Sequence, residues 1–296
     1  MQLDAVMWPD ATWPVVREEW RHAERLGIHR GWFYDHLNLN GPAPWHEAWT
    51  ALAAVAAATS RIGVGTQVTS PNFRHPVTTA KAALSLDALS EGRFVLGIGA
   101  GGPGRDSDAF GGAPLPRTER TARFREYVAL TDRLLRSEHT DVTGTYFTAH
   151  DVALGGGEPR RPPIAIAATG PRGMALAAEF GDLWITQDIA KDPAVSGHTE
   201  IARQLGVLAE VCAEHGRDPA TLPSLAVLGY GDERPLASIE SFRDCVGRYA
   251  ELGVTTLAVL WPREHDQLAV LEEAAALLVP DRVTGGCGDG AATPVR

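Results

Sequence analysis

Cysteine is scarce in this sequence, and none of it stands at a spacing that suggests chemistry. Only three cysteines occur in 296 residues, Cys212, Cys245 and Cys287, and they lie far apart. Zinc and thiol redox sites usually show a Cys-x-x-Cys pair, which this chain does not have. The ten histidines form no His-x-x-x-His pair that could hold a metal from one helix face. The sequence therefore predicts incidental thiols and no protein-held metal.

Positive charge and long apolar runs are also in short supply. Lys and Arg number 27 against 37 Asp and Glu, a net charge of -10, whereas nucleic-acid binding needs clustered cations. No run approaches the roughly 18 to 20 apolar residues that span a bilayer. The first ten residues, MQLDAVMWPD, have no basic flank and do not predict a signal peptide. We therefore expect a cytoplasmic protein with neither nucleic acid nor membrane as a partner.

What the chain does contain is a regular alternation of predicted strands and helices. Apolar, β-branched runs predict strands over residues 2–7, 31–36, 61–69, 93–102, 163–169, 182–186, 222–230 and 255–261. Helical spacing follows each run, over residues 13–26, 45–59, 77–89, 118–136, 172–180, 199–215, 238–252 and 266–278. Eight strand-and-helix units are the number that closes a (β/α)8 TIM barrel. An open doubly wound sheet is the alternative.

The domain organisation follows from this repeat. We expect one barrel domain over residues 1–283 and a flexible C-terminal tail over residues 284–296, where glycine and small residues dominate. Two glycine- and proline-rich segments, 102–117 and 143–162, fall outside the repeat. Long loops in a compact domain are often functional, so both are predicted to be insertion loops.

In such barrels the active site is built from the loops that follow the strands. The second predicted strand ends in Asp35 and His36, and this histidine has a carboxylate beside it in the chain. Histidine is suited to proton transfer near neutral pH. The plain alternative is that Asp35 caps the next turn and His36 is a packing residue.

The ends of the fourth and fifth strands offer backbone for a ligand. Thr169, Gly170, Pro171 and Arg172 precede a helix, and the electropositive start of a helix suits a phosphate. A glycine-proline turn without a ligand is the alternative there. The Gly-x-Gly at the end of the fourth strand lacks the third glycine of a dinucleotide fingerprint, so packing could explain it.

Several longer motifs resemble one known family. They are AERLGIHRGWFYDHL at residues 23–37, the segment 48–102 that contains RIGVGTQVTSPNFRHP and RFVLGIGAGG, the FGG before an Arg-rich helix, and PPIAIAATGPRGMALAAEFGDLWIT at residues 162–186. In this order they resemble the luciferase-like monooxygenase superfamily, and within it the oxidoreductases that depend on the deazaflavin coenzyme F420. The resemblance implies the same (β/α)8 fold that the repeat predicts, in its bacterial luciferase-like form.

The resemblance also implies a cofactor site. It places a non-proline cis peptide at Gln67–Val68, where a bulge that includes Thr69 backs the central ring of the cofactor. It assigns Ala100 and Gly101 to positions beside the ring, and Thr169, Gly170, Pro171 and Arg172 to the loop that holds the cofactor phosphate. It assigns Asp35 and His36 to the polar edge of the ring and the substrate side.

Departures from the family pattern bear on the substrate. Sugar-phosphate dehydrogenases of this family place a glutamate where this chain has Gly102, and a tryptophan where it has Asn40. Glucose-6-phosphate dehydrogenase activity is therefore not expected. Asp106 and Asp108 are the residues available to fill the missing polar role.

The function implied is an F420-dependent oxidoreductase that moves a hydride between the deazaflavin and a small organic substrate. His36 is the expected proton donor or acceptor, with Asp35 orienting it or bonding the ring edge. One alternative is an FMN-dependent luciferase-like monooxygenase that uses dioxygen and reduced flavin from a partner reductase. A cofactor-free barrel with a binding role is the other. The family also implies a homodimer.

Overall fold

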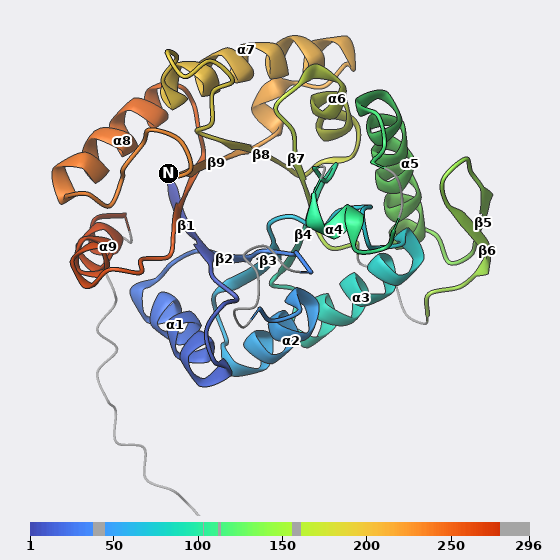
Figure 1. Cartoon of the computed structure of the whole chain (residues 1–296), viewed down its shortest axis with the longest axis horizontal. Helices are drawn as coiled ribbons and strands as arrows, with labels where there is room; N and C mark the ends of the chain where they lie inside the picture. The colour runs from blue at the N-terminus through green and yellow to red at the C-terminus, as the bar shows by residue number, and fades with distance from the viewer. Residues whose placement is uncertain (38–44, 103, 112–113, 156–160, 279–296) are drawn as a thin grey trace, which may run out of the picture.

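The computed structural model describes residues 1–37, 45–102, 104–111, 114–155 and 161–278. Within these ranges, eight parallel strands close into a barrel in the order β1-β10-β9-β8-β7-β4-β3-β2 (Figure 1). They are β1 (Gln2–Met7), β2 (Arg30–Phe33), β3 (Gly63–Thr66), β4 (Phe94–Gly99), β7 (Ile164–Ala167), β8 (Leu183–Gln187), β9 (Ser224–Leu228) and β10 (Thr256–Leu260). The predicted barrel is confirmed, because β1 pairs with β10 and the sheet has no open edge.

Helices surround the barrel, as Figure 1 shows in a view along its axis. They are α1 (Trp13–Leu26), α2 (Ala48–Ala58), α3 (Pro76–Leu89), α5 (Arg117–Arg136), α6 (Pro171–Phe180), α7 (Gly197–Glu214), α8 (Ile239–Glu251) and α9 (His265–Leu278), with a short α4 (Arg105–Asp108) and a 3-10 turn (Pro219–Thr221). Each predicted helix is present to within about three residues of its expected ends. No helix within the described ranges is long and apolar enough to cross a membrane.

The first helix shows how local sequence sets these boundaries. Pro14 lies in the first turn of α1, where its fixed φ is favourable, and Gly27 ends the helix in a left-handed conformation with φ of 81°. Trp20 points inward from α1 and lies over Gly31 of β2, where an added Cβ would come within 2.3 Å of the indole ring. Only glycine at this position allows the helix to pack so close to the strand.

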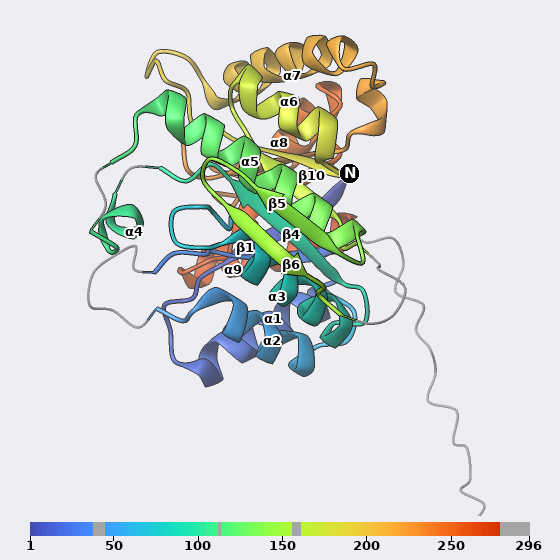
Figure 2. The same ribbon diagram turned by 90° about the vertical axis from the view of Figure 1, so that its right-hand side faces the viewer.

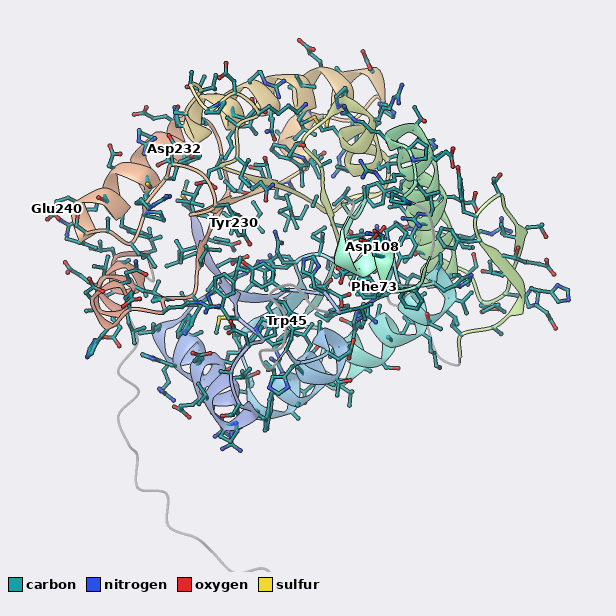
Figure 3. The ribbon with its side chains drawn as sticks, in the orientation of Figure 1. Trp45, Phe73, Asp108, Tyr230, Asp232 and Glu240 are labelled. Carbon is teal, nitrogen blue, oxygen red and sulfur yellow. The ribbon has the colours of Figure 1, made fainter. Side chains whose placement is uncertain are left out.

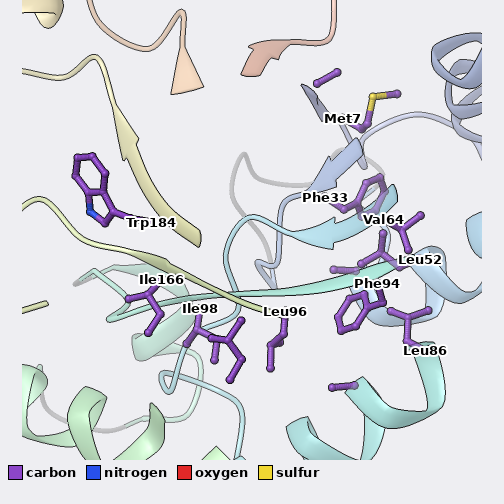
Figure 4. Close-up of a cluster of buried hydrophobic side chains, with 14 of the residues drawn as sticks. Met7, Phe33, Leu52, Val64, Leu86, Phe94, Leu96, Ile98, Ile166 and Trp184 are labelled. Carbon is purple, nitrogen blue, oxygen red and sulfur yellow. The ribbon is translucent and has the colours of Figure 1, made fainter. Parts of the chain in front are cut away.

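Apolar side chains fill two layers. Strand residues that point outward pack under the helices, and Figure 4 shows Phe33, Phe94 and Ile166 in this layer. Residues that point inward, including Trp32 and Leu225, fill the barrel itself. The alternation along each strand assigns successive residues to the two layers, and it becomes decisive at the functional site.

The second of the two segments outside the repeat differs from expectation. The sequence predicts a loop over 143–162, but β5 (Thr140–Thr143) and β6 (Thr148–Val152) form an antiparallel hairpin, which Figure 2 shows beside α5. The loop prediction is wrong for residues 148–152, because TAHDV lacks the apolar alternation of a core strand. Glu126 of α5 holds the hairpin turn by accepting the N–H groups of Tyr146 and Phe147 at 2.8 and 2.6 Å.

The expected domain boundary stays a prediction. All described elements except the β5–β6 hairpin belong to one barrel with its helices. The flexible tail that the sequence predicts over 284–296 lies outside the described residues.

A partly buried carboxylate on α1 makes the stability of the fold depend on pH. Burial raises the pKa of Glu19 to about 7, and the nearby Asp10 adds to the rise while Arg263 opposes it. Because the folded pKa exceeds the usual 4.5, the folded state holds its proton more tightly, and stability falls as pH rises from about 4.5 to 7. Glu19→Gln is therefore expected to raise Tm by about 2 to 4 °C at pH 8 and by much less at pH 5.

Thermal melts of both proteins at the two pH values check this expectation. Glu18→Gln is the matched control, since Glu18 is exposed and its Arg25 hydrogen bond lowers the pKa of the carboxyl instead. An equal gain for Glu19→Gln at pH 5 and pH 8 would contradict the assignment.

Candidate functional site

A cavity of about 890 Å³ opens at the carboxyl end of the barrel, where the sequence predicts the site. Its wall comes from the segments after β2, β3, β4, β7, β8 and β9. Figure 3 shows Trp45, Asp108 and Tyr230 around the middle of the barrel. A volume of this size suits a cofactor together with a small substrate.

The bulge after β3 forms one wall of this cavity. The Gln67–Val68 peptide bond is cis, which confirms the prediction. Both residues line the cavity. Val68 occupies space that Gly99 leaves free, because a Cβ at Gly99 would lie 2.4 Å from Val68 Cγ2. The Gly-x-Gly of β4 therefore serves packing around the bulge: a Cβ at Gly97 would lie 1.8 Å from the Thr66 carbonyl oxygen.

Asp35 does not face the cavity. The sequence suggested that it contacts the cofactor ring or His36 directly, but in the structure its side chain points away from both. Its carboxylate is 2% exposed. It accepts hydrogen bonds from Arg74 at 2.6 and 2.5 Å, from the Thr69 hydroxyl at 2.7 Å and from the Trp49 indole at 3.1 Å. With its oxygens used in this way, Asp35 acts as a structural anchor behind the wall.

The expected place of Thr69 beside the cofactor ring also needs correction. It is fully buried, it is not among the residues that line the cavity, and its hydroxyl is spent on Asp35. The physical reason is the alternation of an extended chain, in which neighbouring side chains point to opposite sides. Tyr34 and His36 face the cavity and Asp35 faces away, just as Val68 and Ser70 face it and Thr69 does not.

His36 lines the cavity and has a carboxylate partner other than the expected one. Its Nδ1 lies 2.5 Å from Oδ2 of Asp106, and the other oxygen of Asp106 accepts the N–H of Leu37 at 2.9 Å. An ionised carboxylate can only accept, so Nδ1 carries the proton and Nε2 of the neutral ring presents a lone pair. Within the described residues, Nε2 makes no hydrogen bond. The arrangement can accept or return a proton.

Of the two aspartates offered for the missing polar role, only Asp106 reaches the cavity. It lines the wall from α4, whereas Asp108 is exposed and does not line it. The pairing of Asp106 with His36 spans 70 positions in the chain. A sequence can indicate that a carboxylate follows β4, but not which of several will turn toward the histidine.

Sequence reasoning missed two tyrosines. Tyr34, just after β2, and Tyr230, just after β9, line the cavity, and their hydroxyl oxygens lie 2.5 Å apart. Buried Asp188 fixes Tyr230 by accepting the backbone N–H groups of Gly229, Tyr230 and Gly231 at 2.9 to 3.1 Å. The signal that could have found Tyr230 is its place at the end of the seventh barrel strand.

Both phenols are donors at neutral pH. Burial raises the pKa of Tyr34 far above its ordinary value, and burial raises the pKa of Tyr230 to about 12. One hydroxyl donates to the other, so one proton remains for a ligand oxygen. The pair adds a neutral hydrogen-bond donor to a cavity in which His36 is the proton acceptor.

The remaining predicted residues divide between the cavity and its edge. Ala100, Gly101 and Thr169 line the cavity. Gly170, Pro171 and Arg172 do not line it, but form the adjoining start of α6. No side chain caps this helix start, and a Cβ at Gly170 would meet nothing within 4 Å. The first N–H groups of a helix lack internal partners, so this open turn suits an anion.

The described residues fit a flavin or a deazaflavin on two structural observations. Oε1 of Gln67 is buried in the wall and has no partner within the described residues, which leaves an acceptor for a ring N–H. The uncapped start of α6 lies next to Thr169 at the cavity edge, where a phosphate could sit. Gln67, Val68, Ala100 and Gly101 would hold the ring, and Thr169 to Arg172 the phosphate.

Comparison with known proteins finds relatives that are named as F420-dependent enzymes. The F420-dependent hydroxymycolic acid dehydrogenase of Mycobacterium tuberculosis is 36% identical over 228 residues, 73% of this chain and 59% of the relative. An F420-dependent glucose-6-phosphate dehydrogenase of Beutenbergia cavernae is 37% identical over 169 residues, 55% of this chain and 49% of the relative. The matches therefore span about half to three fifths of these relatives' lengths.

Solved structures share the fold at low identity. An F420-dependent secondary alcohol dehydrogenase in complex with an F420–acetone adduct superposes with a TM-score of 0.79 at 19% identity, over 92% of this chain and 97% of that one. A riboflavin lyase with modified FMN superposes with a TM-score of 0.78 at 13% identity, over 94% and 91%. The family model described as luciferase-like monooxygenase matches residues 6–273. The chain belongs to the luciferase-like monooxygenase family.

Proposed function

We propose that the protein is an oxidoreductase that uses coenzyme F420 to oxidise or reduce a small organic substrate. The observation that carries the proposal is the position of His36, whose Nε2 is open on the wall shared with the Gln67–Val68 bulge. The names of the curated relatives support the choice of cofactor, since the two compared above are both F420-dependent dehydrogenases. When bound, the deazaflavin supplies a two-electron hydride acceptor or donor.

The residues of this chain supply the proton chemistry. In the oxidation of an alcohol, Nε2 of His36 would accept the hydroxyl proton, and in the reduction of a carbonyl it would return that proton to the oxygen. The bound deazaflavin would supply the matching hydride acceptor or donor. Asp106 keeps the His36 ring in the tautomer that can accept this proton and balances the imidazolium that forms. The free proton of the Tyr34–Tyr230 pair is available to the substrate oxygen.

An FMN-dependent monooxygenase is the second candidate. It is favoured by a solved monooxygenase from Streptomyces bottropensis, which superposes with a TM-score of 0.77 at 20% identity. Such an enzyme needs dioxygen and reduced flavin from a partner reductase. The present site favours F420 because His36 and Asp106 give it a proton acceptor suited to alcohol or carbonyl chemistry.

A titration with each cofactor separates the two candidates. We expect coenzyme F420 to bind with micromolar affinity and FMN to bind much more weakly. Quenching of the protein's fluorescence measures both affinities. Arg172→Ala is expected to weaken F420 binding about tenfold, because a charged hydrogen bond contributes about 1.5 kcal/mol or more. Arg243→Ala on the distant α8, which also removes an exposed cation, is the matched control.

The outcomes are distinct. Micromolar binding of FMN alone would overturn the proposal in favour of the monooxygenase, and binding of neither cofactor would favour a cofactor-free barrel. Equal affinity of Arg172→Ala and the unchanged protein would remove Arg172 from the phosphate site. The homodimer that the family implies and the cytoplasmic location that the sequence predicts are part of the same proposal, and sedimentation of the purified protein measures the first.

A further inference from the structure

A second pocket, of about 340 Å³, opens at the amino end of the barrel. Its lining residues lie at the starts of β1, β2, β4, β7, β8, β9 and β10. In the side view of Figure 2, the N-terminus, where β1 starts, and α4, which contributes to the candidate functional site, lie on opposite sides of the molecule. The volume is at the lower end of the range for ligand pockets, so it suits a small molecule.

The side chains that point into this pocket form a polar half and an apolar half. The polar half comes from the neighbouring strands β2, β1 and β10 and consists of Arg30, Gln2 and Thr256. The apolar half comes from the next four strands, β9, β8, β7 and β4, and consists of Pro223, Leu183, Pro163 and Val95. A ligand that matches both halves carries a polar group at one end and an apolar body at the other.

The other two lining residues, Asp182 and Thr255, have their polar groups in use elsewhere. Oδ2 of Asp182 accepts the N–H of Ile164 at 2.8 Å and pairs with the Arg161 guanidinium. The Thr255 hydroxyl donates to the Ser224 carbonyl at 2.7 Å. Each alternates along its strand with a residue that points inward, so its side chain faces the outer layer. The Asp182 carboxylate is therefore balanced by Arg161 and leaves Arg30 as the cation of the pocket among the described residues.

Arg30 is held in place by the interior of the barrel. Its side chain is 16% exposed, and its guanidinium carbon lies 5.2 Å from the centre of the Trp32 ring. Gly63 makes room for the stem, because a Cβ there would lie 3.0 Å from Cγ of Arg30. A side chain that is already fixed loses little conformational entropy when a ligand binds.

Most of the hydrogen-bond donors of Arg30 remain available. Within the described residues, its guanidinium makes one hydrogen bond, from Nη1 to Oδ2 of Asp4 at 3.4 Å. Asp4 is fully buried and accepts shorter hydrogen bonds from the Trp32 indole at 2.7 Å and from Nδ1 of His29 at 3.1 Å. No nitrogen of Arg30 is among the buried side-chain atoms that lack a partner, so its other N–H groups reach the open space of the pocket. These N–H groups form a planar fork that matches the two oxygens of a carboxylate.

Gln2 adds a neutral donor beside this cation. Its Oε1 accepts the Thr256 hydroxyl at 3.4 Å, which leaves the amide NH₂ group for a ligand. The polar half therefore offers donors from two adjacent strands to one acceptor group.

We propose that this pocket binds a small organic monocarboxylate with an apolar body. Its carboxylate accepts N–H groups of Arg30 and Gln2, and its hydrocarbon part covers Val95 and Leu183, which gains affinity by leaving water. One cation matches one negative charge, and the net charge of -10 disfavours a more highly charged anion. The site lies at the other end of the barrel from His36, so the inference does not depend on the proposed function.

Calorimetric titration of the chain without an N-terminal tag tests this proposal, since Gln2 lines the pocket. The probes are 4-methylpentanoate, its neutral amide 4-methylpentanamide, and acetate. We expect 4-methylpentanoate to bind about tenfold more tightly than the amide, because hydrogen bonds between two charged groups are stronger than those of a neutral acceptor. It should also bind about tenfold more tightly than acetate, because four more apolar carbons leave water.

Variants locate the binding site. Arg30→Met keeps an apolar stem over Trp32 but removes the N–H fork, so it is expected to weaken 4-methylpentanoate binding about tenfold and to change amide binding little. Arg61→Met is the matched control, because Arg61 is exposed two residues before β3 and does not line the pocket. Gln2→Ala changes an exposed side chain and is expected to weaken 4-methylpentanoate binding about threefold.

Several results would overturn the proposal. They are the absence of measurable 4-methylpentanoate binding, equal affinity for 4-methylpentanoate and its amide, and full affinity in Arg30→Met. If Arg30→Met does not fold, full affinity in Gln2→Ala overturns the proposal instead. Binding that is lost in Arg172→Ala but kept in Gln2→Ala would place the anion at the start of α6. The cofactor titrations concern the other end of the barrel, so their failure leaves this result unchanged.

Discussion

Substitution of His36 by alanine is expected to reduce turnover by about 10²- to 10⁴-fold, the usual contribution of a general acid or base. Nε2 is the proton acceptor that the described cavity wall presents beside the bulge, and its ring is held by Asp106 at 2.5 Å. Cofactor affinity should change little, because Gln67, Val68 and the start of α6 keep their positions. The measurement is steady-state turnover with F420, together with an F420 titration of each variant.

Two further variants sharpen the assignment. Added imidazole should restore part of the turnover of His36→Ala, because it supplies the missing proton acceptor without the side chain. Asp106→Asn should lower kcat less than His36→Ala and change the pH profile, since an amide can no longer balance the imidazolium. His46→Ala is the control, because His46 is also partly buried but its Nε2–H donates to the Ala11 carbonyl oxygen, away from the cavity. Turnover of His36→Ala equal to that of His46→Ala would remove His36 from the reaction.

The barrel could be predicted because each unit carries its own signals. Strand and helix boundaries such as those of β1 and α1 follow from apolar alternation, a first-turn proline and a closing glycine. The sequence did not predict the β5–β6 hairpin, because its short strands carry few apolar residues and its turn is held by Glu126 of α5, about 20 positions earlier in the chain. The long segment after β4 contains the short helix α4, where the sequence predicted only a loop.

The candidate site could be predicted as a set of rim positions but not as a set of contacts. His36, Gln67, Ala100 and Thr169 line the cavity as strand-end residues should. Adjacency in the chain suggested that Asp35 serves His36, yet neighbours in an extended segment point apart. Asp106 could not be chosen in advance, because its approach depends on the fold of an irregular segment 70 positions away.

The second large expected effect is a loss of stability when the buried Asp35 carboxylate behind the cavity wall loses its cation. Arg74→Ala is expected to lower the free energy of unfolding by about 3 to 5 kcal/mol, because it leaves the Asp35 charge buried without a cation. Of its partners among the described residues, Asp35 would keep the Thr69 hydroxyl and the Trp49 indole. Arg74 also donates to Glu47 at 2.5 Å; although burial alone would raise the pKa of Glu47, the Arg74 hydrogen bond helps to hold it below the usual value.

Urea unfolding of the unchanged protein and of four variants measures this effect and separates the charge from the geometry. Arg74→Lys should lose less than Arg74→Ala, because an ammonium keeps the charge but cannot make the paired contacts to both Asp35 oxygens at 2.6 and 2.5 Å. Combining Asp35→Asn with Arg74→Ala should recover part of the loss by removing the unpaired charge. Arg125→Ala breaks an exposed pair with Glu179 and should cost less than about 1 kcal/mol. If Arg74→Ala cost no more than Arg125→Ala, Asp35 would not be the anchor of the bulge, and the shape of the cavity wall would have to depend on the packing of Val68 against Gly99 instead.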